Sequence, residues 1–288
     1  MPRILIAGCG YVGNATALLF HESGWEVEGW TRSIDSAEKL SSLPFLVRAV
    51  DITDRDKILS AANKFDRIIH CASSRGGGAS EYRRVYLEGA QNLLDIFAGT
   101  PLLFTSSTSV YAQRDGSWVT ESDPAEPVHE SGQILRETED LVLDRRGIVA
   151  RLAGIYGPGR SFLLQQLLAG KAVIDPKRDR FVNQAHRDDI AAALFLLAQR
   201  RTAEIYNVTD DQPILLSECY KWLAGELHRP IPPEGIVGNR KRGESNKRVS
   251  NKKLRDLGWM PKYGTFQKAM RESVLPAADV NSSNYKPV

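Results

Sequence analysis

Short apolar runs alternate with amphipathic segments through the first half of the chain. The apolar runs have the length of buried strands, and they cover residues 3–7, 25–31, 45–50, 67–71, 102–105 and 148–152. Between them lie segments whose apolar residues recur at helical spacing, notably 81–97 and 133–145. Strands and helices in this order build a parallel sheet that helices cover on both faces. The pattern therefore predicts an α/β fold with a Rossmann-type, doubly wound parallel sheet.

The first predicted strand runs directly into a Gly-x-Gly-x-x-Gly motif, and a helix is predicted to follow over residues 14–23. The first glycine permits a tight turn, the second leaves room for phosphates, and the third lets the helix pack close to the sheet. The positive end of the helix attracts an anion. A structural turn is the alternative, but this order favours a dinucleotide site. Its predicted contacts are Gly8, Gly10, Tyr11, Val12 and Gly13.

The pattern changes after the Tyr-Gly-Pro-Gly sequence in the middle of the chain, because strands become fewer and Arg, Lys, Pro and Gly more frequent. We predict a dinucleotide-binding domain over residues 1–160 and a smaller, mainly substrate-binding C-terminal region over residues 161–288. Within the latter, the pattern predicts a helix over 188–199 and a strand over 203–208. Residues 183–210 are therefore expected to return to the main sheet.

The second predicted strand ends at Thr31, Arg32 and Ser33, with no carboxylate. An acidic residue at this place binds the adenosine ribose in NAD-preferring folds, whereas an arginine accommodates the 2′-phosphate of NADP. We expect Arg32 and Ser33 to hold this phosphate through charge-assisted contacts. A solvated arginine at a strand end is the alternative. NADP is therefore favoured over NAD as the cofactor.

The ends of the next two strands complete the predicted cofactor surface. Asp51 and Ile52 follow the third strand and are expected to border the adenine, although Asp51 could equally cap the helix that follows. Cys71 ends the fourth strand and Ala72 and Ser73 follow it, where the carboxyl ends of parallel strands face the ligand. The sequence therefore assigns both segments to cofactor binding.

Composition excludes several classes of partner. Lys and Arg number 38 against 35 Asp and Glu, a net charge of +3, so neither nucleic acid nor an anionic membrane is expected as a partner. No apolar stretch has the length of a membrane span, and no signal peptide is recognisable, which predicts a cytoplasmic protein. Cys9, Cys71 and Cys219 lie far apart without metal-ligand spacing, so we expect reduced thiols and no metal site.

Several motifs, taken in order, resemble the extended and atypical branches of the short-chain dehydrogenase/reductase superfamily, the NAD-dependent epimerase/dehydratase-like proteins. Besides the glycine motif they are residues 69–72, 106–111, 151–159, 186–190 and 254–261. The likeness spans about the first 270 residues. It implies an NAD(P)-dependent oxidoreductase, epimerase or dehydratase with a small-molecule substrate. It leaves a homodimer open, since helix-pair dimers are common in that superfamily.

The resemblance assigns roles near the substrate. It places Ser107, four residues before Tyr111, where the family's serine or threonine hydrogen-bonds the reacting substrate oxygen. Tyr111 is expected to face the cleft, and Tyr156 and His186 to contact substrate. Each has a plainer alternative, namely an aromatic wall for Tyr111 and a structural role for His186. Arg151 is predicted to be structural, buried by an ion pair whose carboxylate the sequence does not identify.

The chain departs from the family at its Tyr-x-x-x-Lys pair. Ser131 replaces the tyrosine and Leu135 the lysine, and Glu139 follows where the family often has an acidic residue. A serine hydroxyl does not readily ionise near neutral pH, and a leucine supplies neither charge nor hydrogen bond, although general acid/base catalysis needs a pKa near the working pH. Leu135 instead fits an apolar helical stripe that faces the core. The usual proton relay is therefore absent.

Other nearby residues could replace the lost base. His129 titrates in the useful range, Glu130 would do so if partly buried, and Tyr111 belongs to a motif expected near the cleft. Ser131 itself stays a candidate because it occupies the tyrosine position. His129 and Glu130 are equally well explained as solvated loop residues, and geometry must decide.

A cationic cluster lies in the predicted substrate region. Its members are Arg240, Lys241, Arg242, Lys247, Arg248, Lys252 and Lys253. The resemblance implies that Arg242 holds an anionic group, as arginines do in nucleotide-sugar enzymes, whereas a solvated charged face is the alternative. The hypothesis is thus an NADP-dependent enzyme for an anionic or sugar-like substrate. The alternative is a non-catalytic NADP(H)-binding redox sensor or scaffold, which the missing tyrosine and lysine favour.

Overall fold

The computed structural model describes residues 1–74, 76–236 and 245–278. Within these residues the chain forms two compact units. Unit 1 comprises residues 1–110, 124–152 and 190–206, and unit 2 comprises residues 111–123, 153–189 and the described part of 207–288. Each unit is therefore built from segments that are far apart in the sequence.

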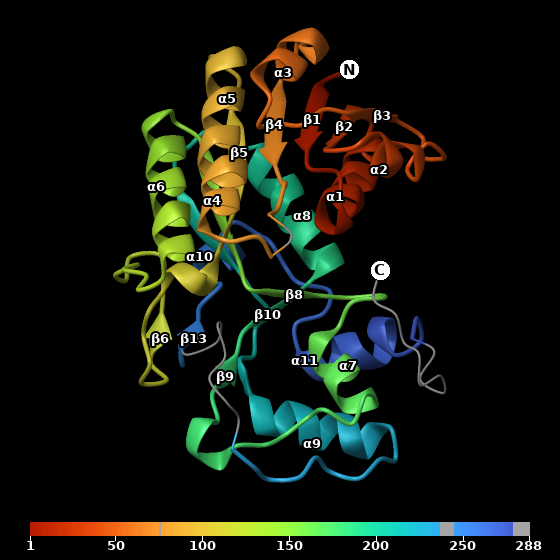
Figure 1. The fold of residues 1–288 in the computed structure, drawn as a ribbon, viewed down its shortest axis with the longest axis vertical. Coiled ribbons are helices and arrows are strands. Elements are labelled where there is room, and N and C mark those ends of the chain that lie inside the picture. The colour runs from red at the N-terminus through yellow and green to blue at the C-terminus, as the bar shows by residue number, and fades with distance from the viewer. Residues whose placement is uncertain (75, 237–244, 279–288) are drawn as a thin grey trace. The chain divides into compact units, whose positions relative to one another are not determined.

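A seven-stranded sheet forms the centre of unit 1 and runs through the upper half of Figure 1. Its strands, in the order β11-β7-β5-β4-β1-β2-β3, are Ile205–Val208, Ile148–Leu152, Leu102–Ser107, Arg67–His70, Arg3–Ala7, Glu26–Thr31 and Leu46–Ala49. Strand β1 pairs in parallel with β2 and β4, and the parallel pairing continues through β3, β5 and β7. The predicted Rossmann-type, doubly wound α/β fold is confirmed. Strand β11 joins this sheet beside β7.

The central strands are apolar because both faces of the sheet are covered. All five residues of β7 are buried, as are four of the five residues of β1. Helix α1, Tyr11–Glu22, packs on β1 and β2 and buries Gly13, Thr16, Ala17 and Phe20, a spacing of one helical face. The hydrophobic pattern thus specifies both the strands and the helix face that meets them.

The remaining helical segments of unit 1 follow the strands in turn. They are α2 Ile34–Glu38, α3 Arg55–Ala61, α4 Ala79–Tyr82, the π-helix Arg83–Glu88, α5 Gly89–Ile96, the 3-10 turn Thr108–Val110, α6 Glu130–Asp144 and α8 Arg187–Ala198, whose first residues belong to unit 2. The helix predicted over 81–97 is therefore a run of three consecutive helical pieces with a π-helical centre. Helices α5 and α6 lie side by side (Figure 1).

Unit 2 combines short strand pairs with short helices. Its strands are β6 Trp118–Val119, β8 Gly154–Tyr156, β9 Phe181–Val182, β10 Gln184–His186, β12 Ile214–Leu215 and β13 Arg248–Val249, paired as β8 with β10, β9 with β12 and β6 with β13. Its helical segments are α7 Phe162–Leu168, Pro176–Arg178, α9 Leu216–Glu226, α10 Lys252–Arg255, α11 Phe266–Ala269 and Met270–Val274. A core that includes Leu164, Leu223 and Phe266 holds these elements together. No helix in the described ranges is long and apolar enough to cross a bilayer.

Candidate active site

The glycine motif forms a tight turn between β1 and α1. Gly8 has a φ of +103°, and a Cβ added to it would lie 2.2 Å from the backbone nitrogen of Ala72. A Cβ on Gly13 would lie 2.2 Å from the carbonyl oxygen of Gly8. A Cβ on Gly10 would meet nothing within 4 Å. Gly8 and Gly13 therefore permit close backbone packing, while Gly10 borders open space.

This turn fits a dinucleotide pyrophosphate. Tyr11 and Val12 are the first residues of α1, so their peptide groups lie at its positive end. No side chain caps this end of the helix, and its first turn contains no acidic residue that would compete with an anion. Gly10 leaves space at the same place. The residues present thus match the chemistry of the cofactor, although contact with it stays a prediction for each of them.

The end of β2 places the predicted 2′-phosphate residues at the surface. Thr31 is buried, and its hydroxyl donates to the carbonyl of Ser33 at 3.2 Å. The Ser33 hydroxyl accepts from the amide of Ser36 and so caps α2. The side chain of Arg32 is 52 % exposed and forms an ion pair of 3.1 Å with Glu81. Arg32 is therefore accessible to an anion, but it already has a carboxylate partner.

The ends of β3 and β4 differ in their exposure. The Asp51 carboxylate accepts from the amide and the hydroxyl of Thr53 at 3.0 and 2.9 Å, while the cap of α3 is Asp54 and not Asp51. Ile52 is 5 % exposed. The amide of Cys71 donates to the carbonyl of Ala7 at 2.7 Å, which draws the chain after β4 toward the glycine turn. Ala72 is half-buried there and Ser73 is exposed, so the predicted segment borders the turn.

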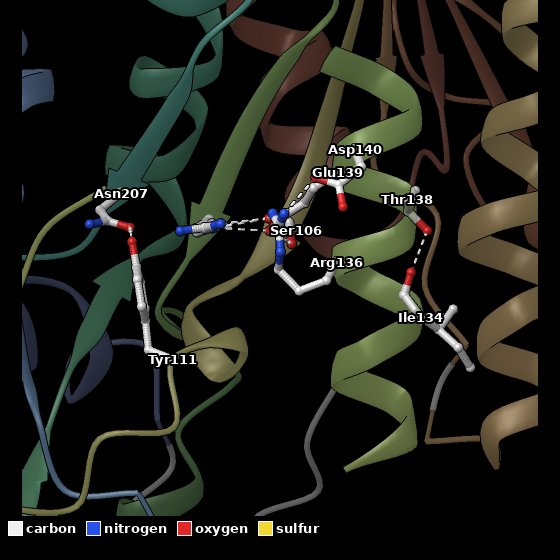
Figure 2. A network of polar contacts seen from close by, with 9 residues as sticks. Ser106, Tyr111, Ile134, Arg136, Thr138, Glu139, Asp140 and Asn207 are labelled. Carbon is white, nitrogen blue, oxygen red and sulfur yellow. Dashed lines mark hydrogen bonds and ion pairs between the residues drawn. The ribbon is translucent and has the colours of Figure 1, made fainter. Parts of the chain in front are cut away.

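The two serines at the end of β5 point in opposite directions, as successive residues of a strand do. Ser107, the last residue of β5, is half-buried, and its Oγ accepts from the amide of Ser109 at 3.1 Å. Ser106 is buried and donates to Oε1 of Glu139 at 2.5 Å (Figure 2). Only Ser107 therefore keeps its hydroxyl outside the buried network.

Glu139 is the carboxylate that pairs with Arg151. Glu139 is 0 % exposed and Arg151 2 %, and Nη2 of Arg151 lies 2.7 Å from Oε2 of Glu139. Arg136, one turn earlier on α6, also contacts this carboxylate and pairs with Asp140 (Figure 2). The prediction that an ion pair buries Arg151 is confirmed. The network ties α6 to β5 and β7 beneath the end of the strand that carries Ser107.

Helix α6 carries the positions of the missing tyrosine and lysine. His129 precedes its first residue and is exposed, as is Glu130, whereas Ser131 is half-buried in the first turn. Leu135 is 4 % exposed and lies on the buried face together with Ile134. The predicted core position of Leu135 is confirmed, so α6 presents no ammonium group there. The geometry leaves His129, Glu130 and Ser131 as solvent-accessible candidates for proton transfer.

Tyr111 is fully buried in unit 2. Its hydroxyl donates to Oδ1 of Asn207 at 2.9 Å (Figure 2). The amide of Asn207 in turn donates to the Glu121 carboxylate, and its Nδ2 to the carbonyl of Ser250. This arrangement favours a structural role for the phenol, and its service as a base stays a prediction.

His186 and Tyr156 lie in the interior of unit 2. His186 is 0 % exposed, its Nδ1 accepts from the amide of Asp188, and its Nε2 lies 3.0 Å from the Ser273 hydroxyl. Burial lowers the pKa of His186 to about 4, so the ring is neutral at pH 7. Tyr156 is 2 % exposed and packs edge-on against His186. Their predicted contact with substrate is untested, and their burial favours a packing role.

Asp189 joins two of the motifs on which the resemblance rests. Its carboxylate accepts from the amides of Lys262 and Tyr263 at 2.6 and 3.0 Å, and its carbonyl accepts from Nε1 of Trp259. Burial outweighs these hydrogen bonds and raises the pKa of Asp189 to about 6. The segment after β10 is therefore anchored to the late Leu-Gly-Trp segment. The sequence showed both motifs but not that they meet.

The described members of the cationic cluster differ in burial: Lys247 is packed into unit 2, whereas the side chain of Lys252 is 78 % exposed. Lys247 is 4 % exposed, and its ammonium donates to the carbonyl of Tyr111 at 3.0 Å. Burial lowers the pKa of Lys247 to about 8. The guanidinium of Arg248 lies over the rings of Trp118 and Phe181. Arg242, predicted to hold the substrate anion, lies outside the described residues.

No group of three or more His, Cys, Asp or Glu side chains in the described ranges could hold a metal ion. Cys9 lies in the glycine turn and is 1 % exposed, and burial raises the pKa of its thiol to about 12. A thiol with such a pKa is neutral at pH 7 and a poor nucleophile.

Comparison with known proteins agrees with this geometry. The profile of the NAD-dependent epimerase/dehydratase family matches residues 4–209, from β1 to the end of β11. The chain belongs to the NAD-dependent epimerase/dehydratase family. The resemblance stated from its motifs is thereby confirmed. As a member of this family, the protein is NAD(P)-dependent and oxidoreductase-like. Family membership does not determine which reaction it catalyses.

Individual relatives of this family protein extend the likeness. Protein YeeZ of Escherichia coli K12 is 32 % identical over 220 residues, which cover 72 % of this chain and 77 % of the relative. A structure from Methylobacillus flagellatus, provisionally labelled an NAD-dependent epimerase/dehydratase, has a TM-score of 0.79 and 29 % identity over 96 % of this chain and 98 % of its own. The dTDP-glucose 4,6-dehydratase of Bacillus anthracis, solved with NAD, has a TM-score of 0.82 at 17 % identity, with 96 % of each chain covered. That last likeness is one of fold alone.

Proposed function

We propose that this protein is an NADP(H)-dependent enzyme of its family that acts on a hydroxylated, anionic, sugar-like small molecule. The observation that carries this proposal is the glycine turn, in which Gly8 packs against Ala72 while Gly10 borders open space at the uncapped end of α1. That arrangement suits a pyrophosphate. The exposed Arg32, and the absence of a carboxylate at the end of β2, support NADP over NAD.

Ser107 is the residue proposed to contact the reacting oxygen. Its hydroxyl stands at the carboxyl end of β5, while the neighbouring Ser106 is held in the buried network. Ser107 would orient and polarise a substrate hydroxyl or carbonyl through one hydrogen bond. The nicotinamide, when bound, supplies or accepts the hydride. The proton is proposed to move through His129, Glu130, Ser131 or water, because Leu135 supplies no ammonium and Tyr111 is committed to Asn207.

A second candidate function is a redox sensor that binds NADP(H) without turning over a substrate. It is favoured by the presence of Leu135 in place of a lysine and by the burial of Tyr111, since leucine has no ammonium group and the Tyr111 hydroxyl is bonded to Asn207. Ser107 favours the enzyme, because a hydroxyl that only stabilises the fold has no need to stand half-exposed at the strand end. The enzyme remains the first proposal.

Titration with NADPH and NADH, followed by cofactor fluorescence, tests the proposal directly. The wild-type protein is expected to bind NADPH more tightly than NADH. Arg32→Ala is expected to weaken NADPH about tenfold or more and to leave NADH nearly unchanged, because a charged hydrogen bond to phosphate contributes about 1.5–3 kcal/mol. Equal losses of affinity for both nucleotides would contradict the assignment of NADP. If the wild-type protein binds neither nucleotide, the proposal is wrong.

Activity separates the two candidate functions. Oxidation of NADPH in the presence of hydroxylated carbonyl compounds is followed by absorbance of the reduced nicotinamide. Ser107→Ala is expected to reduce turnover by about 10²- to 10³-fold while cofactor affinity stays the same, as for loss of a single polarising donor. Cofactor binding without turnover across a broad panel would support the sensor.

A further inference from the structure

Glu81 connects two arginines that are far apart in the sequence. Its Oε1 lies 3.1 Å from Nη1 of Arg32, at the end of β2. Its Oε2 lies 3.1 Å from Nε of Arg84, one turn further along the same helical run. The Glu81 side chain is 26 % exposed, while the arginine side chains are 52 % and 47 % exposed. One carboxylate thus serves two accessible guanidinium groups.

The surroundings of this triad place it beside the proposed adenosine site. Arg32 directly follows the last residue of β2. The hydrogen bond and the charge of Glu81 raise the pKa of Arg84, and the charge of Asp51, which follows β3, adds to this effect. A Cβ on Gly77 would lie 2.6 Å from Cβ of Glu81, so the glycine-rich segment before α4 packs on that side chain. Glu81 is therefore held where the strands end.

We propose that Glu81 and Arg84 set the selectivity of the site for a phosphorylated dinucleotide: Glu81 holds Arg32 and Arg84 until a 2′-phosphate displaces it and takes both guanidinium groups. The proposal rests on the proposed NADP(H) site and names two residues in it that the ends of the strands do not reveal. In sequence, Glu81 lies 49 positions after Arg32.

The charge of a ligand decides whether it can displace Glu81 from Arg32 and Arg84. Two guanidinium groups and one carboxylate carry a net charge of +1. A 2′-phosphate carries about −1.5 to −2 at pH 7 and presents three acceptor oxygens, so it competes with a single carboxylate for both cations. Ribose hydroxyls are neutral and do not displace a charged acceptor. NADPH therefore binds against the cost of breaking two ion pairs, and NADH does not.

Removing the charge of Glu81 is expected to favour the phosphorylated cofactor. In Glu81→Gln both guanidinium groups are released and the repulsion between carboxylate and phosphate disappears. Exposed ion pairs of this type each change an equilibrium by at most about fivefold. We therefore expect the ratio of NADPH to NADH affinity to rise by about three- to tenfold, and less at high salt, which screens exposed charges.

Arg84→Gln is expected to have the opposite effect. It removes one cation, and NADPH affinity is expected to fall about three- to tenfold while NADH affinity stays within twofold. The matched control is Glu137→Gln, because Glu137 forms an exposed ion pair of 2.9 Å with Arg83 that is similar in geometry and not connected to Arg32. This control is expected to change neither affinity.

The titrations use the full-length protein with NADPH, NADH and inorganic phosphate as a competitor, and circular dichroism checks the fold of each variant. An unchanged or lowered affinity ratio in Glu81→Gln, or equal losses for both nucleotides in Arg84→Gln, overturns the proposal. If the proposal is overturned in this way but Arg32→Ala still weakens the binding of NADPH more than that of NADH, the proposed NADP(H) function stands without the roles of Glu81 and Arg84. Failure of the wild-type protein to bind either nucleotide overturns both.

Discussion

Replacing Glu139 with alanine tests whether the buried network stabilises unit 1. The substitution leaves the guanidinium of Arg151, which is 2 % exposed, without its carboxylate partner, and it removes the acceptor of the Ser106 hydroxyl. Breaking a buried ion pair in this one-sided manner costs about 3–5 kcal/mol, because the remaining charge stays desolvated. For a chain of this size the melting temperature is then expected to fall by about 10 °C.

The assay is urea unfolding followed by tryptophan fluorescence, with the free energy of unfolding extrapolated to water. Arg136→Ala is the control, since its side chain is 24 % exposed and water can replace it. It is expected to cost at most about 1 kcal/mol. The double variant Glu139→Leu with Arg151→Met is expected to recover most of the loss, because neither charge is then buried.

A loss below about 1 kcal/mol for Glu139→Ala would refute this reasoning, since it would mean that water or another carboxylate solvates Arg151. Additive losses in the double variant would do the same. In that case the two side chains would act independently, although their atoms lie 2.7 Å apart.

Two further predictions concern the nucleotide turn and the response to pH. Gly8→Ala introduces a Cβ 2.2 Å from the Ala72 nitrogen at a φ of +103°, so NADPH binding is expected to be lost in fluorescence titrations. The control is Gly24→Ala, which also has a positive φ, of +82°, but nothing within 4 Å of its Cβ. This control is expected to retain NADPH binding. His70 is 0 % exposed, and burial lowers its pKa to about 4 from 6.5. Between these values the unfolded chain binds the proton and the folded chain does not, so stability falls as pH drops from about 6.5 to 4, by up to about 3 kcal/mol. His70→Gln is expected to flatten that part of the curve of melting temperature against pH, and an unchanged slope would contradict the assignment.

The parts of the fold that depend on local pattern were predictable from the sequence. The apolar runs of β1 and β7 and the helical spacing of α1 specify their own structure, because their burial follows from period and composition alone. The glycine turn was predictable for the same reason, since Gly8 and Gly13 each meet a steric demand of their neighbours.

The pairings between distant residues were not predictable. The sequence indicated that Arg151 needs a carboxylate and that Leu135 faces the core, but nothing local distinguishes Glu139 from the other acidic residues of α6 as the partner. Lys247 looked like one member of a charged run, and only the folded chain shows its ammonium on the carbonyl of Tyr111. Such contacts depend on how elements pack, which a single sequence does not encode in any local period.

Ser106 and Ser107 carry the same functional group, and only the parity of their positions along β5 assigns them to different faces. A substitution of Ser106 is therefore expected to lower stability, whereas a substitution of Ser107 is expected to alter reactivity if Ser107 has its proposed role, although the chemical change is identical. An insertion or deletion of one residue within that strand would exchange the two hydroxyls, placing the interior one toward the ligand side. We therefore expect β5 not to tolerate a change in length of one residue.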